Sequence, residues 1–219
     1  MHVILLTKKE KPGVRDAVEL ANVYFKNLVV CYGKIKDELP PEIIDKKYDL
    51  IISYLSPWIV PKEILERTIK WNINFHPGPP EFPGIGCFNF AIYKSVKQFG
   101  ATAHIMEPKV DTGEIIGVKH FSMTENETVE TLSKKTYAAL LSLYKDIIDY
   151  IVANNSLPKS DETWKRNPYK RKELEDLATI SENMSKQEID KRIRATYYPG
   201  KPAPYIELFG YRFEYKPDR

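Results

Sequence analysis

The sequence predicts an α/β fold with a mostly parallel sheet, followed by a small C-terminal region of one helix and a β-hairpin. Over the first 155 residues, short apolar runs alternate with stretches of helical periodicity, which is the pattern of βαβ units. A polar stretch without clear periodicity then leads to a tyrosine-rich C-terminal segment. We therefore predict an α/β domain over residues 1–155, a linker over 156–184 and a small helix and hairpin region over 185–219.

In the first part of the chain, strands and helices follow one another in short steps. Four apolar runs predict strands, over residues 2–7, 28–32, 50–54 and 72–75. Helical periodicity and first-turn prolines predict the helices between them, over residues 14–26, 40–46 and 61–69. The buried side of the first helix is predicted to consist of Val14, Val18, Ala21, Val23 and Phe25.

The later elements are predicted in the same way. They are a helix over 88–97, strands over 102–106 and 115–121, and a long helix over 129–152. The linker has one weakly indicated helix, and its charged residues most simply form a solvated face. A helix over 186–194 precedes a hairpin with strands over 205–208 and 211–214. The hairpin turn, Phe209-Gly210, is atypical, because Asn or Asp before the glycine gives a stronger hairpin signal.

The composition excludes several classes of protein. With 219 residues, 29% charged and 42% hydrophobic, and a net charge of +3, the chain is neither disordered, collagen-like nor disulfide-dense. No apolar run approaches the ~18 residues of a membrane-spanning helix, and the first residues lack the features of a signal peptide. We expect a cytoplasmic protein without a membrane partner. Because Cys31 and Cys87 match no ligand spacing, we expect reduced thiols and no metal.

The most specific stretch of the sequence surrounds Asn74 and His76. Side chains alternate along a strand, so these two point to the same face. Pro77 ends the strand directly after them, which places them at its carboxyl end, where open α/β sheets bind ligands. After another predicted strand, Asp111 begins the short loop Asp111-Thr112-Gly113. If the two strand ends are neighbours, the amide, the imidazole and the carboxylate converge.

Such a trio suits acyl transfer to an amine. That reaction passes through a tetrahedral intermediate, which needs an oxyanion donor and a path for the proton of the amine. Asn74 would supply the donor, His76 the proton relay, and Asp111 would orient the imidazole. Neither cysteine has a nucleophile context and no Gly-X-Ser-X-Gly elbow exists, so covalent catalysis is not expected. The alternatives are a strand-end histidine that satisfies a loop carbonyl and an aspartate with only a turn role.

The motifs also carry a family resemblance. Asn74, one residue, His76-Pro77, a Gly/Pro loop and the later Asp111-Thr112-Gly113 resemble the formyltransferases that use 10-formyltetrahydrofolate, over roughly residues 1–150. The resemblance implies a Rossmann-like domain in which Asn74, His76 and Asp111 are the catalytic trio. It also implies that the pterin of the folate lies against two loops, largely through backbone groups. The cofactor-binding residues so implied are Leu55, Trp58, Ile59, Val60, Val110 and Asp111.

Two branches of that family fit the sequence poorly. The segment 8–13 departs from the glycine-rich phosphate loop of the enzymes that formylate glycinamide ribonucleotide. The branch that formylates initiator tRNA usually has a larger, basic C-terminal domain, whereas residues 156–219 contain 14 Lys+Arg against 11 Asp+Glu, so a nucleic acid partner is not expected. The loop 76–86, with Asn89 and Ala91 after it, is most similar to the sugar N-formyltransferases that act on nucleotide-linked amino sugars.

The substrate side of the site is predicted with open alternatives. The rigid loop 77–86 would form a substrate wall, although it could be a plain connector, and Lys8 and Lys9 would contact a diphosphate, although exposed lysines are commonly unpaired. A tyrosine of the hairpin would stack on the substrate's base, or else the hairpin tyrosines pack together or form a homodimer contact. His104 could border the pocket, but we prefer a satisfied core or edge histidine. The substrate-binding residues are predicted as Lys8, Lys9, Phe82, Gly84, Asn89 and Tyr205.

The leading hypothesis from the sequence is an N-formyltransferase. It would transfer a formyl group from 10-formyltetrahydrofolate to the amine of a nucleotide-linked deoxyamino sugar, such as dTDP-4-amino-4,6-dideoxyglucose or a close relative. The product would serve the biosynthesis of surface glycans such as the lipopolysaccharide O-antigen. The alternatives are a glycinamide ribonucleotide formyltransferase and a catalytically silent protein that binds folate or a nucleotide sugar.

Overall fold

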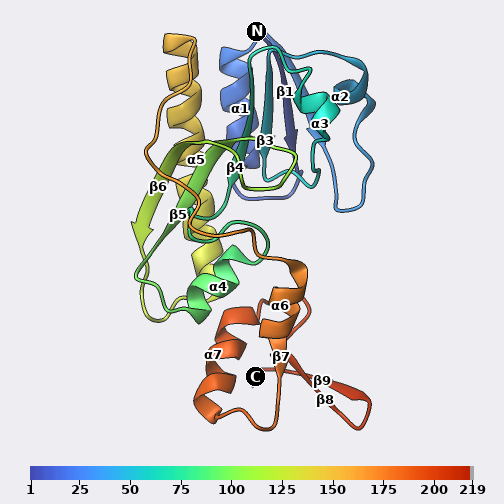
Figure 1. Ribbon diagram of the computed structural model, residues 1–219, viewed down its shortest axis with the longest axis vertical. Coiled ribbons are helices and arrows are strands. Elements are labelled where there is room, and N and C mark those ends of the chain that lie inside the picture. The colour runs from blue at the N-terminus through green and yellow to red at the C-terminus, as the bar shows by residue number, and fades with distance from the viewer. Residues whose placement is uncertain (218–219) are drawn as a thin grey trace.

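A computed structural model describes residues 1–217 and contains two sheets with helices packed around them (Figure 1). The larger part of the chain comprises β1 (His2–Thr7), α1 (Val14–Tyr24), β2 (Asn27–Tyr32), α2 (Pro41–Asp45), β3 (Leu50–Tyr54), α3 (Lys62–Leu65), β4 (Trp71–His76), α4 (Cys87–Tyr93), β5 (Gln98–Ile105), β6 (Ile115–Ser122) and α5 (Val129–Asn154). The C-terminal part comprises α6 (Arg171–Ala178), β7 (Thr179–Ile180), α7 (Lys186–Thr196), β8 (Tyr205–Leu208) and β9 (Tyr211–Glu214).

The larger sheet confirms the predicted fold class. Its strand order is β2-β1-β3-β4-β5-β6, and the first four of these strands run parallel to one another. Strands β5 and β6 are antiparallel additions at one side. The carboxyl ends of β1, β3 and β4 therefore meet at one edge of the sheet, near the middle of the molecule (Figure 1). Ligands bind at this edge in open α/β sheets.

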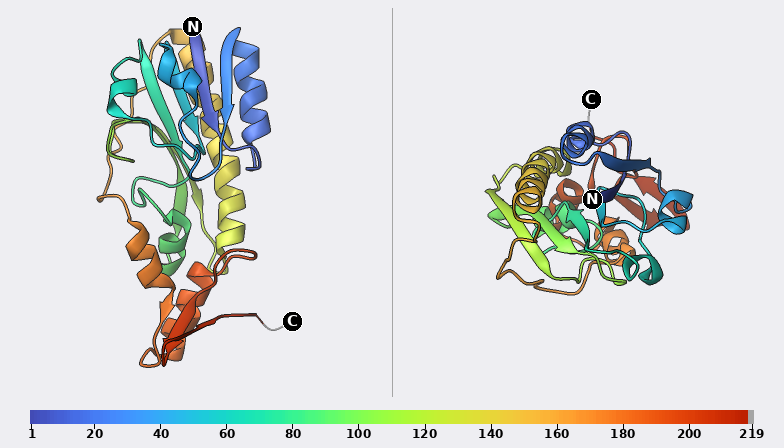
Figure 2. Two further views of the ribbon diagram at one scale, coloured as in Figure 1. Left: turned by 90° about the vertical axis from the view of Figure 1, so that its right-hand side faces the viewer. Right: turned by 90° about the horizontal axis from the view of Figure 1, so that it is seen from above.

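Apolar side chains alternate along the central strands and fill both faces of the sheet. Val3 and Leu5 of β1 pack toward α1 and α5, in a core that includes Leu140, Tyr144 and Ile148. The alternate residues of the same strand contact α2 and α3 on the opposite face, in the cluster Ile4, Leu6, Ile43, Tyr48, Ile51, Ile64 and Leu65. Viewed end-on, the sheet lies between these two helical layers (Figure 2). Burial on both faces explains why the strands are continuous apolar runs.

The prediction is wrong for one residue of the buried side of α1. Val23 is 76% exposed, whereas Val14, Ala17 and Ala21 face the core. A helix advances about 100° per residue, so two positions beyond Ala21 the side chain points away from the sheet. Phe25 is buried as predicted, but it follows the helix in an extended conformation.

The segment between the two parts of the chain packs more closely than a solvated linker. Tyr169 is buried and stacks on Phe90 with ring centroids 3.7 Å apart. Its backbone forms an isolated bridge with Gly84, and it receives a hydrogen bond from Ile85. The weakly indicated helix is present as α6, and it leads into β7 of the three-stranded sheet β7-β8-β9. The predicted division at residues 155 and 184 stays a prediction.

The lower part of the molecule holds α6, α7 and the small sheet (Figure 1). Strands β8 and β9 form the predicted hairpin, and β7 joins β8 in parallel. Phe209 and Gly210, at the turn, have positive φ values of 52° and 80°, so the turn forms without the preferred Asn-Gly pair. Among residues 1–217, no helix combines the length and the apolar character that crossing a bilayer requires.

Candidate active site

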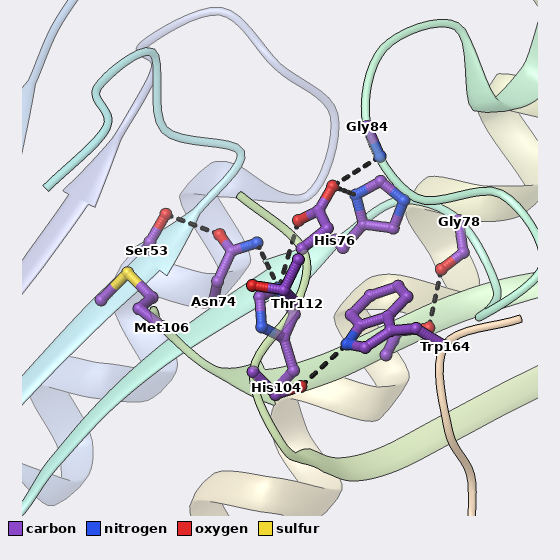
Figure 3. A network of polar contacts seen from close by, with 12 residues as sticks. Ser53, Asn74, His76, Gly78, Gly84, His104, Met106, Thr112 and Trp164 are labelled. Carbon is purple, nitrogen blue, oxygen red and sulfur yellow. Dashed lines mark hydrogen bonds and ion pairs between the residues drawn. The ribbon is translucent and has the colours of Figure 1, made fainter. Parts of the chain in front are cut away.

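Asn74 and His76 lie at the carboxyl end of β4, between β3 and β5 (Figure 3). The parallel register places Asn74 beside Ser53 of β3, whose hydroxyl donates to Asn74 Oδ1 at 2.7 Å. The antiparallel register places Asn74 beside His104 of β5 on the other side. The amide is therefore oriented, with its oxygen toward β3 and its NH₂ group toward β5. This orientation leaves an amide hydrogen available to a bound acceptor.

Asp111 is brought to both histidines by the loop between β5 and β6. Its Oδ2 lies 3.2 Å from His76 Nδ1 and accepts a 2.7 Å hydrogen bond from the Gly84 amide. Its Oδ1 lies 3.2 Å from His104 Nε2. Asp111 has a positive φ of 49°, and the loop closes tightly, because a Cβ at Gly113 would lie 2.0 Å from the Ile105 carbonyl oxygen. The structure thus brings Asn74, His76 and Asp111 to one place, as expected from the sequence. Their catalytic roles stay proposals.

His76 is held between two hydrogen-bond acceptors. Its Nδ1 faces Asp111, and its Nε2 lies 3.0 Å from the carbonyl oxygen of Phe82. A carbonyl oxygen cannot donate, so both bonds form together only when the ring carries both protons. The side chain is only 5% exposed. The alternative interpretation of this histidine was that it only bonds to a loop carbonyl. That bond is present, but together with the contact to the carboxylate.

The carboxyl group of Asp111 stays ionised in this buried setting. Burial alone would raise its pKa, but the charge of His76, the hydrogen bond and charge of His104, and the Gly84 amide together outweigh burial. The pKa of Asp111 is consequently well below its ordinary value. The ionised carboxylate is thus an acceptor for both imidazoles, with one oxygen facing each ring.

His104 is a member of this network that the sequence interpretation assigned to the core. Its Nδ1 donates to the Ile105 carbonyl oxygen at 2.7 Å, and its Nε2 lies 3.0 Å from the Asn74 amide nitrogen. In the neutral ring Nε2 accepts from Asn74, and in the protonated ring it donates to Asp111. The signal that places it here is the antiparallel register of β5, which pairs His104 directly with Asn74.

A cavity of about 260 Å³ opens beside the trio. All residues predicted to bind the folate line it, together with Asn74, His76 and Gly84. The sequence interpretation missed Ser53, Met106 and Glu107, which also line it. The predicted ones are Leu55, Trp58, Ile59, Val60, Val110 and Asp111. Two hydrogen bonds hold the Trp58 ring in place, because its Nε1 donates to the carbonyl oxygens of Asp37 and Glu38 at 3.1 and 2.9 Å.

The predicted substrate residues do not all reach this cavity. Gly84 lines it, whereas the Phe82 ring packs in the core against Phe99 and only its carbonyl contacts His76. Asn89 Nδ2 donates to the Ala195 carbonyl oxygen at 2.7 Å and so links α4 to α7. Three further residues, Lys8, Lys9 and Tyr205, lie outside the lining; Tyr205 belongs to β8, where Arg212 stacks 3.6 Å above its ring. Substrate contact by these residues stays a prediction.

The cysteine nearest the trio is not a nucleophile in this geometry. Cys87 donates from Sγ to the Pro77 carbonyl oxygen at 3.2 Å and is buried beneath the loop. Burial raises the pKa of the Cys87 thiol to about 12. The thiolate is therefore almost absent at neutral pH, in line with the expectation of a non-covalent reaction.

Trp164 covers the two histidines from the segment after α5. Its ring meets His104 edge-on at 5.1 Å between centroids and His76 at 6.0 Å, and its Nε1 donates to the Gly113 carbonyl oxygen at 2.8 Å (Figure 3). No periodicity or motif marks this residue in the sequence. Its position depends on the return of residues 160–170 across the sheet edge, where Tyr169 bridges Gly84.

Loss of this cover should lower turnover. We expect Trp164→Ala to reduce kcat for formyl transfer about tenfold, because the two imidazoles lose the ring that fixes them and water enters the site. Trp164→Phe should retain most of the activity, since an aromatic ring remains. The kcat–pH profile of purified variants measures the effect, with Trp71→Phe as a control for loss of an indole elsewhere. Wild-type kcat and pH profile in Trp164→Ala would contradict this role.

Comparison with known proteins identifies the family. The family model described as formyl transferase matches residues 3–148 of this chain. The chain belongs to the formyl transferase family. The matched range contains Asn74, His76 and Asp111, and it ends within α5. The resemblance stated from the sequence is thereby confirmed.

Curated relatives within this family differ in their substrates. The chain is 28% identical over 151 residues to the methionyl-tRNA formyltransferase of Bacillus subtilis, covering 67% of this chain and 48% of the relative. It is 26% identical over 164 residues to the GDP-perosamine N-formyltransferase of Brucella melitensis, covering 74% of this chain and 62% of the relative. The chain thus spans about half to two thirds of the length of these relatives.

Solved structures share the fold over nearly the whole chain. A sugar N-formyltransferase from Shewanella superimposes with a TM-score of 0.79 at 20% identity, covering 99% of this chain and 96% of the other. A 4-N formyltransferase from Francisella tularensis gives a TM-score of 0.78 at 19% identity, with 97% and 95% covered. An N-formyltransferase from Helicobacter canadensis, in complex with folinic acid and dTDP-3-aminofucose, gives 0.74 at 17% identity, with 96% and 85% covered.

Proposed function

We propose that this protein transfers a formyl group from 10-formyltetrahydrofolate to the amine of a nucleotide-linked deoxyamino sugar. The observation that carries the proposal is the convergence of Asn74, His76 and Asp111 beside the cavity. Family membership supports formyl transfer, and the match in fold to sugar N-formyltransferases along nearly the whole chain supports the class of acceptor. The homodimer, the cytoplasmic location and a place in O-antigen biosynthesis stay predictions.

The cavity has the chemistry that a folate needs. Its wall is mainly apolar, with Leu55, Val60 and Met106 next to the aromatic ring of Trp58, and such a wall suits the flat face of a pterin. The lining also includes residues of the two loops, 55–60 and 110–111, whose backbone groups would pair with the polar edge of such a ring. Leu55 and Asp111 have positive φ values of 52° and 49°, which turn the backbone sharply at these two places. Asn74, His76 and Asp111 line the same cavity.

The residues of the trio divide the chemistry among them. During transfer, a bond forms between the sugar nitrogen and the formyl carbon while the bond from that carbon to the folate nitrogen breaks. Asn74 Nδ2 would stabilise the negative charge on the formyl oxygen, and protonated His76 would add to this when its Nε2 turns from the Phe82 carbonyl oxygen to the substrate. One proton leaves the sugar amine and one is gained by the folate nitrogen, and His76 would carry it while Asp111 holds the imidazole. No cysteine, serine or metal is needed in this scheme.

The identity of the sugar is a separate part of the proposal. A dTDP-4-amino-4,6-dideoxyglucose or a close relative is our preferred acceptor, and the relatives include proteins named for 4-N formylation and for GDP-perosamine. A further neighbour was solved with dTDP-3-aminofucose, so the acceptor screen includes different bases and different positions of the amine.

The predicted homodimer has support in the small sheet. Strand β9 pairs only with β8 among the described residues, so its other edge is free. Phe209, Tyr211 and Phe213 of this hairpin are exposed. A free edge with adjacent aromatic side chains suits pairing with a second copy of the chain.

A screen of acceptors tests the proposed function. We expect a formyl mass gain on one or more amino sugars among dTDP-, UDP- and GDP-linked compounds when the protein and 10-formyltetrahydrofolate are added. Glycinamide ribonucleotide and initiator methionyl-tRNA serve as competing acceptors. Mass spectrometry of each reaction gives the answer, with His76→Gln as the inactive control. Transfer to glycinamide ribonucleotide alone, or ligand binding without any transfer, would overturn the proposal.

A further inference from the structure

The segment 164–169 precedes α6 and passes over the loop 77–86 of the candidate site. After α5 the chain runs back along the molecule to its lower part, where α6 begins (Figure 1). Three backbone hydrogen bonds tie this segment to the loop. The Lys165 amide donates to the Pro80 carbonyl oxygen at 3.0 Å, the Tyr169 amide donates to the Pro83 carbonyl oxygen at 2.9 Å, and the Tyr169 carbonyl oxygen accepts from the Ile85 amide at 3.0 Å. The loop is thus held at three places by one stretch of chain.

The two loop groups that contact the trio lie between these ties. The Phe82 carbonyl oxygen is 3.0 Å from His76 Nε2, and the Gly84 amide donates to Asp111 Oδ2 at 2.7 Å. Oδ2 is also the oxygen that faces His76 Nδ1, so the amide fixes the rotation of the carboxylate that holds the imidazole. A displacement of residues 82–84 would loosen both contacts of the His76 ring at once.

Gly84 allows the segment and the loop to approach closely. It has a positive φ of 86°, and a Cβ built on it would lie 2.5 Å from the carbonyl oxygen and 2.6 Å from the amide nitrogen of Tyr169. A side chain at this position would collide with backbone atoms, so glycine is required here. The backbone of Tyr169 therefore packs directly against the residue that donates to Asp111.

The Tyr169 ring anchors the segment 164–169. It stacks on Phe90 of α4 with centroids 3.7 Å apart and planes 9° from parallel, and the Arg166 guanidinium carbon lies 3.2 Å from the same centroid. Two groups this close on one face would overlap, so Phe90 and Arg166 lie on opposite faces of the ring. Arg166 is held in turn by Glu173 of α6 at 2.9 Å. The Tyr169 hydroxyl is buried without a hydrogen-bond partner among the described residues, so the ring and not the hydroxyl supplies the anchor.

We propose that Tyr169 is a positioning residue for formyl transfer, whose anchored ring keeps the Gly84 amide on Asp111 and so keeps His76 aligned. The inference rests on the proposed function for the reaction itself. His76, His104 and the Gly84 amide are the groups that face the carboxylate. Release of the loop would leave the carboxylate with two of these three partners. A misplacement of about 1 Å at a catalytic group costs up to ~10²-fold in rate.

Truncation of the ring tests this role. We expect Tyr169→Ala to lower kcat at least roughly tenfold, with a smaller change in KM for either substrate, because alignment and not binding is lost. Tyr169→Phe loses only the unpartnered hydroxyl and should keep the wild-type kcat. Leu177→Ala is the matched control, because it removes a buried side chain from the same apolar cluster, in α6.

Amide hydrogen exchange measured by NMR gives a readout that does not depend on turnover. The Gly84 amide should exchange at least roughly tenfold faster in Tyr169→Ala than in the wild type, Tyr169→Phe or Leu177→Ala. Arg166→Met leaves the buried ring in place and should change kcat and this exchange in the same direction but by less. It decides the question if the Tyr169→Ala protein does not fold.

Three results would each overturn the role. They are wild-type kcat in Tyr169→Ala, unchanged Gly84 exchange in that variant, and an equal loss of kcat in Leu177→Ala. If the wild type formylates no amino sugar, the proposed function fails, and the exchange of the Gly84 amide still shows whether Tyr169 holds the loop.

Discussion

Replacement of His76 by glutamine is expected to lower kcat for formyl transfer by about 10³-fold or more. The imidazole is the only group in the trio that can both donate a proton and accept one near neutral pH, and general acid–base catalysis contributes about 10² to 10⁴ in rate. In the proposed mechanism His76 also stabilises charge at the formyl oxygen, which would add to that loss. Glutamine keeps a hydrogen-bond donor for the Phe82 carbonyl oxygen, so the loop should stay in place.

The effect should fall on kcat and not on KM. On the proposed function, the folate would contact the cavity wall and the sugar a separate part of the site, so neither would rely on His76 for most of its binding energy. Initial rates over a range of both substrates give the two constants, and circular dichroism confirms that the variant is folded. His120→Gln is the matched control, because this histidine is more exposed and only approaches Glu162 at 3.7 Å. Turnover within tenfold of the wild type in His76→Gln would refute the assigned role.

The trio could be predicted because its geometry depends on local rules. Because side chains alternate along a strand, Asn74 and His76 share a face, and Pro77 ends the strand directly after them. Only the position of Asp111 depends on which strand lies beside β4. That strand is β5, and Asp111 lies in the short loop that follows it. Strand order was thus the single non-local assumption, and the family resemblance supported it.

The rest of the site depends on contacts that sequence patterns do not encode. His104 reaches Asn74 only because β5 runs antiparallel to β4, and an isolated polar residue on a buried strand does not indicate direction. Trp164 comes from a segment that returns over the sheet edge, at long sequence separation from His104. Asn89 is a further example, since its hydrogen bond to the Ala195 carbonyl oxygen links α4 to α7, and no local pattern indicates that contact.

Replacement of Asp111 by asparagine is expected to reduce kcat by about 10³-fold and to destabilise the protein. The carboxylate accepts from His76, His104 and the Gly84 amide, and its two oxygens serve all of them. Asparagine has one oxygen and one NH₂ group, so at least one of these donors would face another donor. An orienting aspartate in a comparable hydrogen-bonded triad is worth about 10⁴ in kcat. Loss of one partner from a buried ion pair costs about 3 kcal/mol of unfolding free energy or more.

The stability difference should depend on pH in a direction set by the pKa of Asp111. Because the folded state lowers this pKa below its ordinary value of about 4, the ionised carboxylate stabilises the fold above that pH. This stabilisation is lost as the pH falls from about 4 toward the folded pKa. Urea unfolding of wild type and Asp111→Asn should therefore differ most near pH 7 and converge in acid. Asp37→Asn is the control, since this exposed carboxylate accepts only the Lys34 amide. A difference that stays constant from pH 7 to about 3 would show that Asp111 does not hold its partners through charge.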